Sequence, residues 1–277
     1  MSYRDVLAIA PAGESDGHAI AFAQQLAQSS RGHLSVLLVA WRADVPMLVE
    51  GMSLAPVWQE QAREAERELE TRRQLMDARL RKAYANCTVE TLLVTEGEAR
   101  AKVAQFARCR DLAIIGRPGR DVLGDPHTPL IEGALFGSGR PVVVIPAGWT
   151  PRPVGSRIAI GWNSSREAAR AINDASPFLA SAEHVGVITI GADAAQAPEM
   201  HADIEAHLAR RGISSEARCV APSGRSETAA MLDEVAALEA DILVMGGYGR
   251  SRFAEMVFGG MTREMLKSST LPLFLSH

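Results

Sequence analysis

Short apolar runs of strand length recur along the whole chain, five in each half. They are rich in Val, Ile and Leu, and most are bounded by polar, glycine or proline residues, which is the composition of buried β-strands. In the first half they cover residues 5–10, 33–40, 88–94, 111–116 and 141–146. In the second half they cover residues 157–162, 184–191, 216–222, 241–247 and 271–276.

Segments with helical spacing of apolar positions lie between these runs. They cover residues 16–30, 57–84, 98–109 and 129–138, and then 165–181, 199–211, 226–239 and 262–268. Continuous apolar strands separated by helices predict parallel sheets that are covered on both faces. Because the same order of elements occurs twice, we expect an internal duplication, with two tandem α/β domains of five strands each.

The expected boundary between the domains is the segment AGWTPRPVGS, residues 147–156, whose prolines and glycines suit a linker. We therefore predict domains at 1–148 and 155–277. The two halves align well, since DLAIIGRPGR at 111–120 matches DILVMGGYGR at 241–250. The first half carries a longer charged insert that includes 57–84. We expect an amphipathic helix packed on the sheet there, and a partner-binding helix is the alternative.

Composition and charge narrow the class of protein. The 277 residues are 47% hydrophobic and 22% charged, with a formal net charge of −4, so we expect no nucleic-acid or membrane partner. The longest apolar runs are far shorter than the roughly 20 residues of a membrane helix. No signal-peptide pattern opens the chain, and the expected location is the cytoplasm. Three cysteines and seven histidines lack metal-ligand spacing, so no metal site is expected.

A glycine-rich stretch, MGGYGRSRFAEMVFGGMTREML at 245–266, follows the fourth strand of the second repeat and continues into its last helix. Ligands of open parallel sheets bind beyond the carboxyl ends of the strands. Backbone N–H groups of a glycine turn and of a helix N-terminus form a natural cradle for an anion. The alternative interpretation is that these glycines serve chain reversal only.

The spacing Gly246-x2-Gly249-x9-Gly259 resembles the nucleotide loop of the universal stress protein family. The phrases RIAIGWNSSREAARA, DILVMGGYGR and GGMTREML are similar to that family's first strand, fourth strand and terminal helix. The resemblance covers essentially the whole chain as two tandem domains. It implies a Rossmann-like fold, of the adenine nucleotide alpha hydrolase-like type, with five parallel strands in order 3-2-1-4-5. It also implies that the two domains pair as a pseudo-dimer.

Carried over residue by residue, the resemblance implies a nucleotide site in the second domain. Two positions depart from the family pattern, because Asn163 stands where ATP-binding members carry aspartate and Gly260 stands where they carry Ser or Thr. A missing hydrogen bond to a charged group is worth about 1.5–3 kcal/mol, so binding weakens about ten- to hundredfold without being abolished. The predicted nucleotide-binding residues are Asn163, Ile190, Met245, Gly246, Gly249, Gly259, Gly260, Met261 and Thr262.

The first domain departs further from this pattern. Thr128 occupies the position of the third glycine, and Pro129, which faces Gly260, removes an N–H donor. Proline suits the first turn of a helix. Asp121 and Asp125 add negative charge that repels phosphate. We expect no triphosphate site here, and the domain completes the pseudo-dimer. In the second domain, Ser165 is expected to be a helix N-cap rather than a nucleophile.

Two functional hypotheses follow. In the first, a stress-response protein binds an adenine nucleotide, ATP, in its second domain, with or without Mg²⁺. It then acts as a sensor or regulator without efficient turnover. No catalytic residue is assigned, so we expect no enzyme, although slow ATP hydrolysis stays open. In the second, the loop is vestigial and the protein is an interaction scaffold. A further homodimer is compatible with both hypotheses.

Overall fold

The computed structural model describes residues 2–12, 17–43, 55–117, 125–191, 197–247 and 260–277. Two compact units make up the chain. We call them the N-terminal unit, which holds residues 3–116 and 122–140, and the C-terminal unit, which holds residues 1–2, 117–121 and 141–277.

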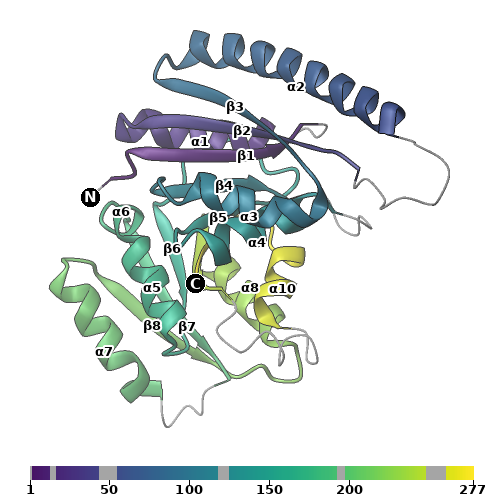
Figure 1. Cartoon of the computed structure of the whole chain (residues 1–277). Helices are drawn as coiled ribbons and strands as arrows, with labels where there is room; N and C mark the ends of the chain where they lie inside the picture. The colour runs from purple at the N-terminus through teal and green to yellow at the C-terminus, as the bar shows by residue number, and fades with distance from the viewer. Residues whose placement is uncertain (1, 13–16, 44–54, 118–124, 192–196, 248–259) are drawn as a thin grey trace. The chain divides into compact units, whose positions relative to one another are not determined.

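The N-terminal unit is built on four parallel strands in the order β3-β2-β1-β4 (Figure 1). Its strands are β1 (Asp5–Pro11), β2 (His33–Trp41), β3 (Cys87–Val94) and β4 (Leu112–Gly116). Its helices are α1 (Gly17–Ser30), α2 (Ala55–Ala83), α3 (Glu96–Ala107) and α4 (His127–Gly137).

The C-terminal unit contains all five strands of the second repeat, in the order β8-β7-β6-β9-β10. They are β6 (Arg157–Gly161), β7 (His184–Ile190), β8 (Ser215–Val220), β9 (Ile242–Gly246) and β10 (Leu273–Ser276), all parallel to their neighbours within the repeat. This is the order 3-2-1-4-5, and the predicted fold is confirmed. The last strand of the first repeat, β5 (Val142–Ile145), belongs to this unit and pairs antiparallel with β10.

The helices of the C-terminal unit follow the predicted segments, with one difference. They are α5 (Arg166–Asp174), α6 (Ser176–Leu179), α7 (Ala197–Arg210), α8 (Glu227–Ala237) and α10 (Met261–Ser268). The predicted single helix at 165–181 is divided at Ala175, which has φ −80° and ψ 2°. The physical reason is Pro177, which has no N–H to donate to the carbonyl of Asn173; the hydroxyl of Ser176 donates to that carbonyl instead.

Polar side chains fix where several helices begin. The hydroxyl of Ser165 accepts a hydrogen bond from the N–H of Ala168 at 3.2 Å, so the predicted N-cap is confirmed. Ser226 does the same for α8, accepting from Ala229 at 3.1 Å. These contacts satisfy N–H groups that have no acceptor within the helix. As a result, α5 and α8 start at defined points close to the carboxyl ends of β6 and β8.

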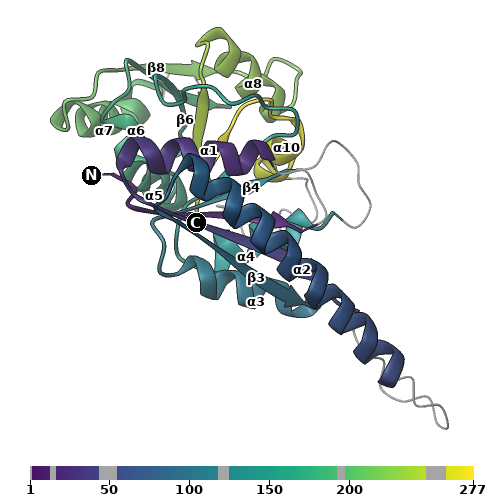
Figure 2. The same ribbon diagram turned by 90° about the horizontal axis from the view of Figure 1, so that it is seen from above.

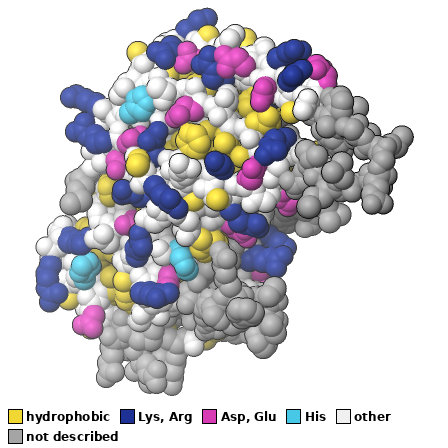
Figure 3. All heavy atoms as spheres, in the orientation of Figure 1, with side chains coloured by type: hydrophobic (Ala, Val, Ile, Leu, Met, Phe, Trp, Pro, Cys, Tyr) yellow, Lys and Arg dark blue, Asp and Glu magenta, His cyan; other side chains and the backbone are white. Residues whose placement is uncertain are grey.

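The long helix α2 is amphipathic, as predicted, and lies beside β3 (Figures 1 and 2). It contributes Leu69 and Leu80 to the core, and ion pairs such as Arg81–Asp77 stand on its solvent side. Figure 3 shows positive and negative side chains interspersed over the face in view. Within the described residues, no helix is both long enough and apolar enough to span a membrane.

Candidate functional site

Three strand ends of the second repeat lie side by side where a ligand is expected. Strand β6 lies between β9 and β7, with Gly161 opposite Met245 on one side and Ile188 on the other. Asn163 follows β6, Ile190 ends β7 and Gly246 ends β9. The structure therefore brings the predicted residues on these three strands to one edge of the sheet, which is the usual ligand side of a parallel sheet.

Asn163 is exposed and forms part of the turn that enters α5. Its Oδ1 accepts a hydrogen bond from the N–H of Ser165 at 3.2 Å, and Ser164 has a φ of 56°. The two N–H groups of the Asn163 amide are not needed for this turn. A side chain whose oxygen is occupied and whose donors remain can bind a neutral acceptor, such as a ribose hydroxyl or a ring nitrogen.

Gly246 has a structural reason to be glycine. A β-carbon at this position would lie 2.6 Å from the nitrogen of Ala168 and 2.7 Å from the carbonyl carbon of Glu167, closer than real β-carbons approach backbone atoms. The N–H of the next residue, Gly247, donates to the carbonyl of Ser276 at 2.8 Å. This donor is engaged within the protein, so an anion at this edge must use N–H groups further along the chain.

A buried carboxylate at this edge was not singled out from the sequence. Glu167 is the second residue of α5, with only 3% of its surface exposed, and it pairs with the exposed Arg166. Burial alone would raise the pKa of Glu167, but the hydrogen bond from Arg166, its backbone hydrogen bond and the nearby His277 together lower it. An acid in the first turn of a helix is common, so the sequence offered no signal that this one is buried.

The two residues predicted to contact the adenine ring are apolar, and a hydrogen-bond network lies beside them. Met245 is buried, and Ile190 is half-buried at the end of β7. The hydroxyl of Thr189 donates to the carbonyl of Trp162 at 2.9 Å and lies 2.8 Å from Nε2 of the buried His201. Because the hydroxyl proton is used by Trp162, Nε2 of His201 is the donor to Thr189. Sequence reasoning missed this network, which ties α7 to the ends of β6 and β7.

Helix α10 begins at the third predicted group of site residues. Gly260 is its N-cap, with φ −62° and ψ 143°, and none of the described side chains caps the helix there. Met261 is half-buried and Thr262 is buried. At the other end of the helix, the guanidinium of Arg117 donates to the carbonyl oxygens of Leu266 and Ser269, the latter at 3.0 Å. The predicted phosphate glycines Gly249 and Gly259 lie outside the described residues.

In the first repeat, a carboxylate lies at the start of α4, the helix that corresponds to α10. Asp125 accepts hydrogen bonds from the N–H of His127 at 2.9 Å and from the hydroxyl of Thr128 at 3.1 Å, and Nδ1 of His127 lies 2.9 Å away. Burial would raise the pKa of Asp125, but the hydrogen bonds from His127 lower it overall. Pro129 is buried in the first turn of α4, as expected. A carboxylate therefore already accepts hydrogen bonds at the start of α4.

A small cavity of about 270 Å³ lies at the carboxyl ends of β1 and β2. Helix α2 closes it with Leu69, and Pro126 contributes to another wall. This volume falls below the roughly 300–1,000 Å³ that is usual for sites of drug-sized ligands. Among the residues described, no three His, Cys, Asp or Glu side chains gather as metal ligands.

Comparison with solved structures decides the fold family. A universal stress protein from Archaeoglobus fulgidus matches 99% of this chain and 98% of its own, with a TM-score of 0.69 and 15% identity. The chain has the universal stress protein fold. A putative universal stress protein from Pseudomonas aeruginosa covers 99% of this chain and 93% of its own, with a TM-score of 0.56 and 17% identity.

A third structure, a Pseudomonas aeruginosa protein described as functionally unknown, covers 99% of this chain and 92% of its own, with a TM-score of 0.56 and 15% identity. No protein-family model and no curated protein matches the sequence. Because the matched structures span the chain from end to end, the universal stress protein fold occurs here in its two-repeat form.

Proposed function

We propose that this chain is a stress-response protein of the universal stress protein type, with tandem domains at 1–148 and 155–277. In this proposal it binds ATP at the carboxyl edge of the second repeat. The observation that carries the proposal is the position of Gly161 between Met245 and Ile188, because it puts the strand ends that bear Asn163, Ile190 and Gly246 side by side. The loop spacing Gly246-x2-Gly249-x9-Gly259 then supplies backbone donors that lead to α10.

Each part of the nucleotide has a proposed partner. The apolar Met245 and Ile190 hold the adenine, and the amide donors of Asn163 bind the ribose. The N–H groups at Gly249, Gly259, Gly260 and Met261 hold the phosphates, with Thr262 at the start of the same helix. Since the described residues offer no set of metal ligands, we propose that any Mg²⁺ arrives bound to the triphosphate oxygens.

The first repeat supports a single site per chain. The carboxylate of Asp125 already accepts the hydrogen bonds at the start of α4, and Pro129 has no N–H to offer. A phosphate placed there would meet a like charge and find fewer donors. We propose that this repeat completes the pseudo-dimer and binds no triphosphate.

The proposed role is regulation rather than catalysis. ATP shifts a conformational or partner equilibrium by binding one state more tightly than another. No general base is assigned at the proposed γ-phosphate position, and the buried Glu167 is paired with Arg166. The proposed location is the cytoplasm.

A scaffold role is the second candidate, and two observations favour it. Gly246 is explained by its close approach to α5, and the N–H of Gly247 is used by Ser276. Both are consistent with glycines retained for folding alone. A nucleotide titration separates the two functions.

The test is equilibrium titration of ATP into the purified chain and two variants. Gly259→Asp places a carboxylate in the proposed phosphate loop and abolishes saturable binding. Gly97→Asp is the matched control, since Gly97 lies in the first turn of α3 and a β-carbon there would meet only Oγ1 of Thr95, at 4.0 Å, so binding stays unchanged. Absence of binding at millimolar ATP in the native chain eliminates the nucleotide proposal and leaves the scaffold.

A further inference from the structure

Among the described residues, the outer strand of the N-terminal unit has one row of backbone groups without a partner strand. β3 pairs with β2 on one side and is the last strand of that sheet on the other. The carbonyl oxygens of Asn86 and Val94 accept hydrogen bonds from Leu34 and Arg42, on the β2 side. Because backbone groups along a strand point alternately to its two sides, even-numbered residues 88–92 face β2 and odd-numbered residues 87–93 face outward.

The sequence of β3, CTVETLLV, has one charged residue, Glu90, and lacks most of the features that usually protect an edge. Edge strands are commonly blunted by proline, lysine or a bulge. β3 has no proline or lysine, and its pairing with β2 is continuous from Cys87 to Val94, without a bulge. The outward N–H and C=O groups form no hydrogen bond with other described residues. Such an edge is a template for another extended strand.

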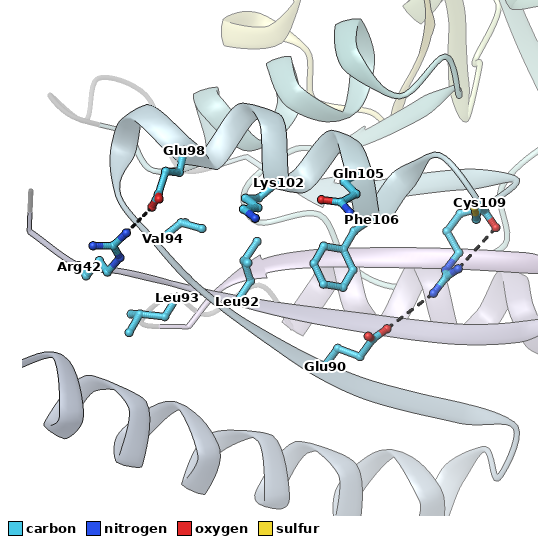
Figure 4. Close-up of a pocket in the computed structure, with 11 residues that line it drawn as sticks. Arg42, Glu90, Leu92, Leu93, Val94, Glu98, Lys102, Gln105, Phe106 and Cys109 are labelled. Atoms are coloured by element: carbon cyan, nitrogen blue, oxygen red, sulfur yellow. Dashed lines mark hydrogen bonds and ion pairs between the residues drawn. The ribbon is translucent and has the colours of Figure 1, made fainter.

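A groove of about 550 Å³ runs beside this edge, between β3 and α3 (Figure 4). Leu92 from the strand and Phe106 from the helix, both half-buried, lie next to each other in its middle. Leu92 is even-numbered and stands on the α3 face with Glu90 and Val94. An added strand would therefore direct every second side chain into this groove.

Ion pairs close the two ends of the groove and leave a positive charge between them. Glu98 pairs with Arg42 at 2.7 Å, and Arg110 is shared between Glu90 at 3.6 Å and Asp5 at 3.3 Å. Figure 4 shows Lys102 between these pairs, above Leu92. Lys102 is exposed and makes no ion pair with the residues that the structure describes. Both carboxylates of the groove already pair with arginines, whereas the ammonium group of Lys102 remains available. The groove therefore favours an occupant with a carboxylate.

We propose that the outer edge of β3 and this groove bind an extended segment of a partner protein. The segment adds as a strand to β3, places an apolar side chain between Leu92 and Phe106, and brings an acidic side chain two positions away to Lys102. Backbone hydrogen bonds supply affinity in this mode, and alternate side chains supply specificity. A small amphipathic molecule would use the groove but leave the outward backbone groups of β3 unpaired, so the polypeptide accounts for both observations.

The first experiment titrates a defined peptide into the full ¹⁵N-labelled chain. The probe is the acetylated and amidated peptide STETITETS, whose central Ile is flanked two positions away by Glu on each side. We expect saturable shifts of the backbone amides of Thr91 and Leu93. The control peptide STKTITKTS reverses the charge and binds about tenfold more weakly or worse. Absence of saturable shifts at millimolar STETITETS overturns the proposal.

Two variants test the two halves of the contact. Thr91→Pro removes an outward N–H that β2 does not use, and proline is tolerated on that side of an edge strand. It lowers peptide affinity about tenfold or more, with the circular dichroism spectrum retained. Lys102→Glu reverses the preference, so that STKTITKTS binds better than STETITETS. The matched control is Lys82→Glu on α2, outside the groove, which leaves both affinities unchanged.

The Lys102→Glu exchange keeps the test valid if Thr91→Pro does not fold. Peptide binding that Thr91→Pro leaves intact, or a preference that Lys102→Glu does not reverse, overturns the proposal. Analytical ultracentrifugation of the native chain tests the other candidate occupant of the edge, which is a second copy of this chain. Self-association that Thr91→Pro abolishes would assign the edge to a second copy and would overturn the partner-protein proposal.

Discussion

Gly246 approaches the first turn of α5 so closely that a β-carbon on it would lie 2.6 Å from the backbone nitrogen of Ala168. The contact joins the end of β9 to the helix that follows β6. It gives one glycine of the predicted nucleotide loop a packing role in addition to any role in binding. Substitutions can therefore separate glycines that the fold needs from glycines that the ligand needs.

Gly246→Ala is expected to destabilise the protein whether or not it binds nucleotide. The added methyl group must displace backbone atoms, and overpacking of this kind costs about 1–3 kcal/mol. Urea unfolding monitored by circular dichroism measures the change. Gly97→Ala, where there is room for a side chain, is the control and leaves stability unchanged or slightly raised. Equal stability of both variants and the native chain would contradict the packing role.

Gly260→Ser is expected to improve nucleotide binding. The φ and ψ of Gly260 suit any residue, and serine at this N-cap adds a hydroxyl where the family pattern has one. One hydrogen bond to a charged phosphate is worth about 1.5–3 kcal/mol, so ATP affinity rises about tenfold or more. Gly260→Ala is the control without a hydroxyl, and its affinity does not rise. Calorimetric titration compares the three proteins.

Asp125→Asn is expected to weaken the start of α4. The lost charge–dipole and hydrogen-bond contributions are typical of helix caps, about 0.5–2 kcal/mol of the free energy of unfolding near neutral pH. The folded pKa of Asp125 is lowered, so its contribution is present above the unfolded pKa of about 3.9 and is lost as pH falls through the folded pKa. The stability difference between the native chain and Asp125→Asn therefore shrinks as unfolding is measured at progressively lower pH below about 4. A difference that stays constant with pH would exclude this role.

Arg117→Ala is expected to loosen α10. The guanidinium holds two carbonyl oxygens at the C-terminal end of that helix, and hydrogen bonds to charged groups contribute about 1.5–3 kcal/mol. Hydrogen exchange of the α10 amides is predicted to accelerate, and ATP binding to weaken with it. Arg63→Ala, which removes only an exposed i,i+3 pair with Glu60, costs less than about 1 kcal/mol and leaves α10 unchanged.

The sequence predicted ten strands because buried strands are continuous apolar runs, such as LAIIG in β4 and ILVMG in β9. The order of the strands within a repeat was implied by the family resemblance, and the antiparallel pairing of β5 with β10 was not predicted. The sequence also located the N-cap at Ser165. It did not predict the division of 165–181, although Pro177 stands inside the predicted helix, where its missing N–H and its ring oppose continuation. The pairing of Glu167 with Arg166, the Thr189–His201 contact and the capture of the Gly247 N–H by Ser276 join residues through the fold, with no local pattern to reveal them.

Calorimetric titration of ATP into the native chain tests the central claim most directly, because it counts sites as well as detecting them. The account predicts one site per chain, in the second repeat, with the first repeat blocked by Asp125. Two sites per chain, or no heat of binding at millimolar ATP, would contradict it.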